Sequence, residues 1–178
     1  MTSEAVTYRA AGPGDAAALA GLAREAFVAA FGPLYQSRDL AAFLAEERSE
    51  ERYAGQIADP AVRIRLAELN GAPVAYSLIV LGKGFDERPM PQPLRPVMLS
   101  QLYCAGEATG RGIGAALLDW AIGKARCWGA DALQLSVFSE NPGAQRFYRR
   151  HGFVHVADIH FWVSQHRDDE FLYELPLI

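Results

Sequence analysis

The chain has 178 residues, of which 51% are hydrophobic and 21% are charged, and its formal net charge is −4. This length suits one domain with a substantial core, so we expect a single domain over residues 1–178, and the composition excludes a disordered chain. The acidic balance argues against a nucleic-acid partner, because binding to phosphates needs a surplus of Lys and Arg.

The cysteines and the N-terminal residues indicate in which compartment the protein is expected. Cys104 and Cys127 are too few for a disulfide framework, and no Cys/His cluster has metal-ligand spacing, so we expect no metal. The first ten residues lack the basic and then apolar pattern of a signal peptide. No stretch approaches the roughly 18 consecutive apolar residues that a membrane helix needs. We therefore expect a cytoplasmic protein without a membrane partner.

Turn residues and hydrophobic periodicity divide the first part of the chain into a strand and three helices. Val6–Ala10 is predicted to be a strand, and Asp15 is predicted to cap a helix that ends near Ala30. Two further helices are predicted, one from Ser37 and one at Glu50–Ala58. The strands predicted after them are Arg63–Leu69, Val74–Leu81, Val97–Cys104, Ala132–Phe138, Phe153–Val163 and Glu170–Leu177.

The connections between these strands complete the prediction. The turn Asn70-Gly71-Ala72-Pro73 indicates a hairpin, and the proline-rich stretch Gly82–Pro96 indicates an exposed loop. Two more helices are predicted, Gly112–Trp128 and Asn141–Arg150, the first closed by Gly129. The element order predicts an α/β (α+β) fold, with a mixed central sheet of about seven strands flanked by helices.

Three glycines crowd into five positions, at Gly110, Gly112 and Gly114, between an apolar strand and a helix. Such a turn exposes several backbone N–H groups at a helix N-terminus, where the helix dipole also favours negative charge. Glycine lets the backbone approach an anion without interference from a side chain. The pattern therefore predicts a binding site for a phosphate or pyrophosphate.

Two familiar phosphate-binding motifs fit this stretch poorly. A Walker P-loop is excluded, because no Gly-Lys-Ser/Thr follows the glycines. A dinucleotide fingerprint matches loosely as Gly110-x-Gly112-x-x-Ala115, with Asp131 about the right distance downstream. However, Asp131 precedes its strand instead of closing it, and three predicted strands come before the strand that leads into the glycines. Coenzyme A is the third phosphate-containing ligand to consider.

Two segments resemble motifs of the GCN5-related N-acetyltransferase (GNAT) superfamily. Thr109–Gly114 resembles its acyl-CoA loop, Gln/Arg-x-x-Gly-x-Gly/Ala, with Thr109 at the first position. Asn141-x-x-Ala144-x-x-Phe147-Tyr148-x-x-x-Gly152-Phe153 resembles its C-terminal motif. The element order agrees as well, so the resemblance covers essentially the whole chain. It implies a GNAT fold, a single N-acetyltransferase domain, and an acyl-CoA loop between the fourth strand and the helix after it.

The resemblance also implies a set of site residues for acetyl-CoA as cosubstrate. Tyr148 matches the general acid that protonates the leaving sulfur, and Asn141 would cap its helix and bond the pantetheine arm. The N–H of Leu102 would face the thioester oxygen, and its strand would pair with the pantetheine. The implied cofactor-binding set is Leu102, Tyr103, Cys104, Gly110, Arg111, Gly112, Ile113, Gly114, Ala115, Asn141 and Tyr148.

The general base is not evident, because Gln101 stands where many relatives carry Glu, and Gln takes up no proton. We expect the amine to lose its proton through water or to solvent. Phe27, Phe31 and Tyr35 are expected in the core, with one of them lining the acceptor site.

The expected acceptor is a primary amine of a small molecule, with a polyamine as the leading candidate. The segments Leu102-Tyr103 and Phe147–Phe153 and a predicted acidic turn, Asp168-Asp169-Glu170, are similar to bacterial spermidine/spermine acetyltransferases. The acidic patch of Glu46, Glu47, Glu50 and Glu51 would attract a cation, although such runs are usually only solvated. The alternatives are a protein N-terminal or lysine acetyltransferase and a non-catalytic acyl-CoA sensor, and the assembly considered is a homodimer.

Overall fold

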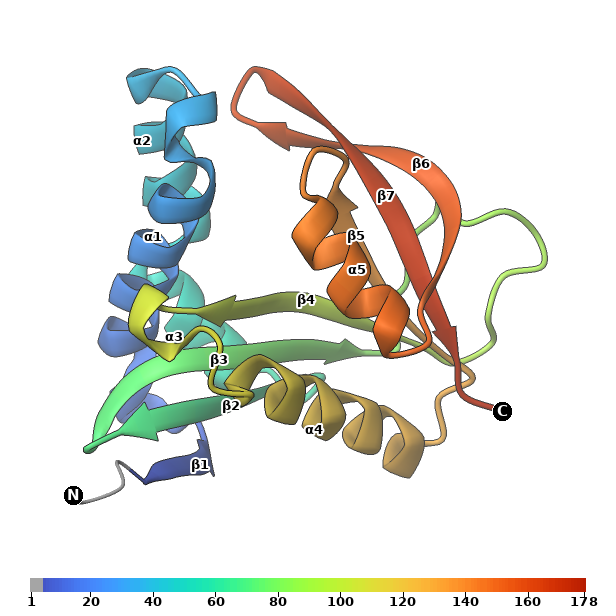
Figure 1. The fold of residues 1–178 in the computed structure, drawn as a ribbon, viewed down its shortest axis with the longest axis horizontal. Helices are drawn as coiled ribbons and strands as arrows, with labels where there is room; N and C mark the ends of the chain where they lie inside the picture. The colour runs from blue at the N-terminus through green and yellow to red at the C-terminus, as the bar shows by residue number, and fades with distance from the viewer. Residues whose placement is uncertain (1–4) are drawn as a thin grey trace.

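A seven-stranded sheet in the order β1-β2-β3-β4-β5-β7-β6 forms the centre of the molecule (Figure 1). The computed structural model describes residues 5–178, so the first four residues of the predicted domain lie outside it. Neighbouring strands run antiparallel except β4 and β5, which are parallel. The predicted mixed sheet flanked by helices is confirmed. The strands are β1 (Val6–Ala10), β2 (Val62–Leu69), β3 (Ala72–Leu81), β4 (Pro96–Cys104), β5 (Ala132–Phe138), β6 (Val154–Val163) and β7 (His166–Pro176), and the helices are α1 (Ala16–Phe31), α2 (Ser37–Glu47), α3 (Glu50–Ala58), α4 (Ile113–Trp128) and α5 (Pro142–Arg150).

The helices cover opposite faces of this sheet. Leu66 of β2 packs in one apolar cluster with Leu19 of α1, whereas the next residue, Ala67, packs in another with Leu117 of α4. Successive strand residues point to opposite faces, so α1 and α4 lie on different sides. Helix α5 joins the α4 side, where Phe147 packs against the core cluster. The core is therefore two apolar layers, one on each side of the sheet.

A bulge in β4 changes which side chains face each layer. In the pairing with β3, Leu78 lies opposite Gln101 and Ile79 lies opposite Leu99, so Ser100 is an extra residue. As a result Leu99 and Leu102, three positions apart, both pack on the α4 side. Gln101 is left to face the α1 side.

The central strands β4 and β5 separate soon after they begin. Their pairing covers only Pro96–Met98 of β4, against Ala132–Gln134 of β5. Beyond this point they diverge, which Figure 1 shows as a widening gap between the two ribbons. The sheet therefore opens in the middle, next to the residues of the predicted C-terminal motif.

Helix α1 is more apolar than the sequence prediction allowed. With its flanking turns, Pro13–Leu34, it has 22 residues, and an 18-residue window within it has a mean hydropathy of 1.3, so the segment is long and apolar enough to cross a membrane by length and composition. Arg24 and Glu25 interrupt this segment, so an average of hydropathy identifies it whereas a search for consecutive apolar residues does not. Leu19 and Ala23 are fully buried against the sheet and α3, which accounts for the apolar face of this helix.

The ends of several elements match the turn chemistry. Asn70 and Gly71 have φ values of 52° and 79° and form the tight hairpin turn that their sequence predicts. Gly129, with a φ of 81°, closes α4 as expected. The prediction for Asp15 is wrong in detail, because its carboxylate accepts from the N–H of Gly12 at 2.7 Å and makes no side-chain cap on α1.

The last hairpin differs from the prediction. Its turn lies at Ser164 and Gln165, and Ser164 adopts a φ of 55°. The segment Asp168-Asp169-Glu170, predicted as an acidic turn, instead lies within β7, where Glu170 is opposite Ile159 of β6. The predicted turn is therefore wrong, and alternation along the strand sends Asp168 and Glu170 to one face of the sheet.

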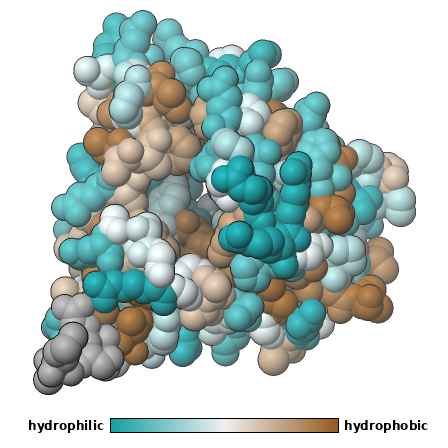
Figure 2. Space-filling model, in the orientation of Figure 1, coloured by the Kyte–Doolittle hydropathy of each residue, from teal (hydrophilic) through white to brown (hydrophobic). Residues whose placement is uncertain are grey.

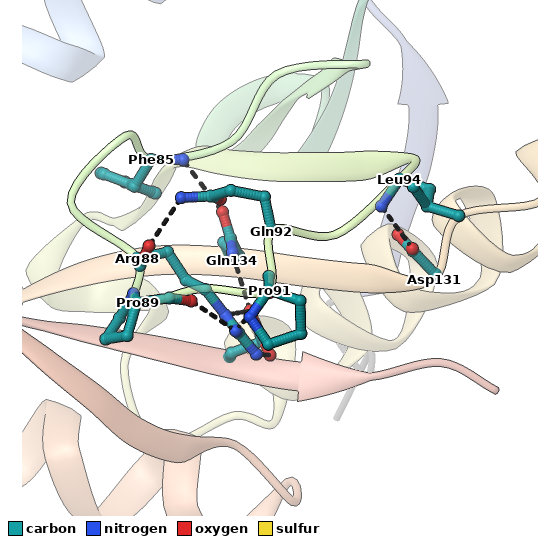
Figure 3. A network of polar contacts seen from close by, with 9 residues as sticks. Phe85, Arg88, Pro89, Pro91, Gln92, Leu94, Asp131 and Gln134 are labelled. Carbon is teal, nitrogen blue, oxygen red and sulfur yellow. Dashed lines mark hydrogen bonds and ion pairs between the residues drawn. The ribbon is translucent and has the colours of Figure 1, made fainter.

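The proline-rich loop at residues 82–95 is held to the sheet by polar contacts (Figure 3). The guanidinium of Arg88 donates two hydrogen bonds to the carboxylate of Glu174, at 3.0 and 2.8 Å, and Gln134 donates to the same carboxylate at 2.7 Å. Asp131 accepts from the N–H of Leu94 at 2.6 Å. The Asp131 carboxylate is thus engaged by the backbone of this loop. It is not available to bind a ribose, as the dinucleotide fingerprint would require.

Candidate active site

The gap between β4 and β5 borders a cavity of about 790 Å3. Its walls come from both strands, from α1, α2 and α5, and from the β6–β7 hairpin. Figure 2 shows the surface hollowed between the side of α1 and α2 and the side of the hairpin. A cavity of this size is typical of small-molecule sites. The predicted site residues on its wall are Leu102, Tyr103, Cys104, Asn141 and Tyr148.

Helix α5 brings Tyr148 to this wall. The side-chain oxygen of Asn141 accepts from the N–H of Ala144 at 3.1 Å, which caps the helix as predicted. The ring of Tyr148 packs edge-on against Phe147 and Phe153, with centroids 5.1 and 5.6 Å apart. Burial raises the pKa of the Tyr148 phenol, so the group keeps its proton at neutral pH. A protonated phenol in a cavity can act as a proton donor.

The glycine loop has two residues in the left-handed backbone conformation that favours glycine. Gly110 and Gly112 adopt φ values of 74° and 76°, and Gly112 is the N-cap of α4. A Cβ at either position would meet no atom within 4 Å, so the backbone conformation, and not crowding, explains these glycines. Ile113 is 1% exposed and offers only its backbone. An open loop at the N-terminus of a 16-residue helix suits a pyrophosphate.

The loop lies beside the cavity and is not part of its wall. A Cβ on Gly114 would lie 3.7 Å from Sγ of Cys104, so the start of α4 touches the end of β4. Arg111 is exposed and Ala115 is half-buried. The hydroxyl of Thr109 donates to the carbonyl of Gly106 at 2.7 Å and closes the turn before the glycines. The glycine loop at the start of α4 is thus adjacent to the end of β4, where Leu102, Tyr103 and Cys104 line the cavity.

Gln101 is fixed by two tyrosines that the sequence analysis did not find. Its Oε1 accepts from the hydroxyl of Tyr53 at 2.8 Å and from that of Tyr76 at 2.7 Å, and the two hydroxyls lie 3.0 Å apart. Both tyrosines are fully buried, and Gln101 is 6% exposed. These contacts make Gln101 a structural anchor of β4.

Two carboxylates of β7 reach the cavity, and sequence reasoning missed both. Asp168 is 4% exposed, accepts from the hydroxyl of Tyr35, and lies 3.2 Å from Nε2 of His166. Burial raises the pKa of the Glu170 carboxyl, Asp168 raises it further, and a hydrogen bond with Ser136 works against both. Oε2 of Glu170 is buried and has no hydrogen-bond partner within residues 5–178. Glu170 is therefore a carboxylate with unused capacity to accept.

A buried arginine and an aromatic group form the wall on the side of α1 and α2. The Arg48 guanidinium lies 5.6 Å from the ring centroid of Phe27 and 5.0 Å from that of Phe43, and donates to the hydroxyl of Tyr103 at 3.0 Å. Phe27, Phe31 and Tyr35 all line the cavity, where the prediction had placed only one of them. Nothing in the sequence pattern singles out Arg48.

The opening is lined by different chemistry on its two sides. Phe171 and Tyr173 of β7 pack on the α4 side, together with Tyr148. Because strand residues alternate, Glu170 faces the α1 side. A ligand in the opening therefore has a phenol on one side of the sheet and a carboxylate on the other. Within the described part of the chain, no group of three or more His, Cys, Asp or Glu side chains could hold a metal ion.

Comparison with known proteins decides the family. The profile of the acetyltransferase (GNAT) family matches residues 24–153, which is most of the chain. The chain belongs to this family. An uncharacterized N-acetyltransferase of Mycobacterium bovis is 30% identical over 164 residues, covering 92% of this chain and 99% of the relative. The expectation of an acetyl-CoA-dependent N-acetyltransferase is confirmed at this level.

Solved structures support the fold of this acetyltransferase. The PaiA N-acetyltransferase of Thermoplasma acidophilum, in complex with coenzyme A, matches with a TM-score of 0.76 and 19% identity, over 97% of this chain and 99% of that one. The ribosomal-protein-S18-alanine N-acetyltransferase of Escherichia coli matches with a TM-score of 0.69 and 17% identity, over 97% of this chain and 94% of that one. At these identities the likeness concerns the fold alone.

Proposed function

We propose that this acetyltransferase transfers an acetyl group from acetyl-CoA to the primary amine of a small molecule. The observation that carries the proposal is the cavity in the split sheet, with Tyr148 on one side and Glu170 on the other. Acetyl-CoA supplies the activated acetyl group as a thioester. The chain must then bind that group, orient the amine, and move two protons.

The cofactor half of the site uses backbone groups. The N–H groups of Gly110–Ala115 hold the pyrophosphate at the start of α4. Beyond Met98, β4 has no ladder with β5, so the backbone of Leu102–Cys104 borders the opening without a strand on that side. An extended pantetheine arm pairs there as an added strand would. Asn141 bonds the same arm, and the N–H of Leu102 faces the thioester oxygen.

The two protons are handled by different residues. Tyr148 donates its phenolic proton to the departing sulfur as the C–S bond breaks, since the raised pKa keeps the phenol protonated. The nitrogen that has attacked the acetyl carbon releases its second proton at the same stage, and this proton restores the Tyr148 phenol. An alkyl ammonium, like Lys with a pKa of about 10.4, must lose a proton before it can attack. Glu170 binds the ammonium and accepts this proton, because its Oε2 is buried and unpartnered in the described residues. Gln101 is excluded from this role by its amide chemistry and its two tyrosine partners.

The acceptor is a small amine, and a polyamine is one candidate. Glu46, Glu47, Asp168 and Glu170 all line the cavity and would attract a cation. A protein N-terminus is the second candidate, because an Escherichia coli enzyme named for a ribosomal-protein alanine shares the fold. The cavity volume of about 790 Å3 supports a small molecule over a polypeptide. A purely acyl-CoA-sensing protein has no need of Tyr148 and Glu170 on opposite sides of the opening.

An amine panel tests the proposed function. Release of the coenzyme A thiol is followed with polyamines, amino acids, simple alkylamines and short peptides as acceptors, and the acetylated product is identified by mass. The expected result is amine-dependent thiol release with at least one small amine. Tight coenzyme A binding without thiol release for any acceptor would favour the sensor, and turnover with peptides alone would favour a protein acceptor.

A further inference from the structure

Arg48 is a buried cation without a carboxylate partner. Its side chain lies in the cavity wall and is 6% exposed, yet within residues 5–178 no Asp or Glu forms an ion pair with it. The adjacent acid, Glu47, pairs with Arg52 at 3.3 Å and offers Arg48 only its backbone carbonyl, at 3.0 Å. A buried charge is costly unless an opposite charge and hydrogen bonds compensate for it.

The hydrogen-bond inventory of Arg48 is incomplete. A guanidinium has five N–H groups, and two contacts are seen, from Nη1 to the Glu47 carbonyl and from Nη2 to the Tyr103 hydroxyl. Nε is buried and has no partner among the described residues. The rings of Phe27, Phe43 and Tyr103 lie around the guanidinium and supply cation–π attraction, but they accept no hydrogen bond from its edge.

The other cationic side chains of the cavity wall are exposed to solvent, unlike Arg48. Arg52 is 52% exposed and has Glu47 as partner, and Lys83 is exposed. Water can solvate both of these charges. Arg48 alone is a desolvated cation with spare donors, and a planar fork of N–H groups of this kind matches a carboxylate.

Aromatic rings connect Arg48 to the acidic end of the same wall. Phe27, which lies against the Arg48 guanidinium, is stacked on Tyr35 with centroids 6.0 Å apart. The Tyr35 hydroxyl in turn donates to Asp168, two residues from Glu170 on the same face of β7. The wall on the α1 side therefore has a buried guanidinium at one end, buried carboxylates at the other and an apolar middle. Glu46 and Glu47 also lie at the Arg48 end, but Glu46 is exposed to water and Glu47 is paired with Arg52.

We propose that the acceptor is a small molecule whose primary amine and carboxylate are separated by a carbon chain, such as an ω-amino acid. The carboxylate binds Arg48, the carbon skeleton lies against Phe27 and Tyr35, and the amine lies at Glu170, where it is acetylated. This proposal rests on the proposed function and narrows its acceptor, because a polyamine has no group to neutralise Arg48.

The first test uses matched acceptors with the wild-type enzyme. Glycine, β-alanine, γ-aminobutyrate, δ-aminovalerate and the common L-amino acids are each compared with the corresponding amine that lacks the carboxylate, and with diamines of similar length. The expected kcat/KM is at least about tenfold higher for the best amino-carboxylate than for its partner amine, because only the former bonds Arg48. Equal or greater kcat/KM for alkylamines, diamines or peptide amines would overturn the proposal while leaving amine acetylation intact. Silence across all acceptors would overturn the proposed function itself.

The second test asks whether Arg48 causes the preference. Arg48→Gln should remove most of the advantage of the carboxylate, mainly through KM, whereas activity with the partner alkylamine should fall less. Arg52→Gln is the matched control, because it removes an exposed cation of the same wall, and its preference should equal that of the wild type. An unchanged preference in folded Arg48→Gln would overturn the assignment. Arg48→Lys, which keeps the charge, should retain part of the preference and serves if Arg48→Gln fails to fold.

Discussion

The hydroxyl of Tyr76 donates a 2.7 Å hydrogen bond to the amide oxygen of Gln101, at the point where β4 leaves its bulge and borders the cavity. Tyr53 donates to the same oxygen at 2.8 Å. The amide oxygen of Gln101 is thus a neutral acceptor that already holds two hydrogen bonds. These two hydrogen bonds hold β4 in place. The carboxylates Asp168 and Glu170, which line the cavity, come from β7 instead.

This arrangement predicts a stability effect for Gln101→Met. The variant removes the common acceptor of two buried phenols and leaves them only each other, at 3.0 Å. The free energy of unfolding should fall by about 1–3 kcal/mol, because a buried hydroxyl loses its partner. Urea denaturation measures this loss. A variant as stable as the wild type would contradict the anchoring role, and Tyr8→Phe, outside the network, should change little.

Tyr148→Phe should lower kcat about a hundredfold or more, because the departing thiolate loses its proton donor. The KM for acetyl-CoA should stay near that of the wild type, since the ring and its packing on Phe147 and Phe153 are retained. Steady-state assays of thiol release measure both constants.

The matched control for this prediction is Tyr173→Phe. Tyr173 belongs to the same apolar core, and its hydroxyl is buried without a partner in the described chain. Removing that hydroxyl should leave kcat unchanged and the protein equally or more stable. If Tyr148→Phe turns over like Tyr173→Phe, the phenol of Tyr148 is not the acid.

Gly112→Asp should weaken coenzyme A binding, because it places a carboxylate at the loop proposed to hold the pyrophosphate. Gly112→Asn is the control, since Asn and Asp both tolerate the left-handed backbone found there and both suit an N-cap. The dissociation constant from calorimetry should rise about tenfold more for Asp than for Asn, and the difference should shrink at high salt. Equal constants for the two variants would place the pyrophosphate elsewhere.

The residues proposed to bind coenzyme A could be predicted from short stretches of sequence. The left-handed Gly112, the cap at Asn141 and the position of Tyr148 on α5 all depend on short segments, so their motifs could be recognised without the fold. The order of the elements then followed from turns and periodicity.

The residues on the side of the cavity proposed to bind the acceptor depend instead on how strands and helices far apart in the sequence pair and pack. Glu170 faces the cavity only because β7 pairs with both β5 and β6, and its acidic neighbours suggested a turn. Gln101 faces the tyrosines only because Ser100 forms a bulge. Arg48 stands at the end of α2, where its burial depends on α1 and β4 packing around it. No spacing within the sequence encodes these placements.

Glu170→Gln tests the proton acceptor through pH. Burial and Asp168 raise the pKa of the Glu170 carboxyl, and only its ionised form accepts a proton, so wild-type kcat/KM should rise with pH through that raised pKa. The Gln variant should lose both this limb of the profile and most of its activity. The exposed neighbour Asp169, altered to Asn, should keep the wild-type profile. An active variant with an unchanged acid limb would remove Glu170 from the proposed mechanism.

The same shift has a consequence for stability that separates catalysis from folding. A raised pKa means that the folded state binds the Glu170 proton more tightly than the unfolded state does. The stability associated with this group is therefore fully present below the unfolded pKa and is lost as the pH rises through the folded pKa. At neutral pH, Glu170→Gln should be at least as stable as the wild type, and the difference should shrink as acid protonates Glu170. A variant that is inactive yet equally or more stable at neutral pH would locate the defect in the chemistry, whereas one that is less stable there would contradict the direction of the shift.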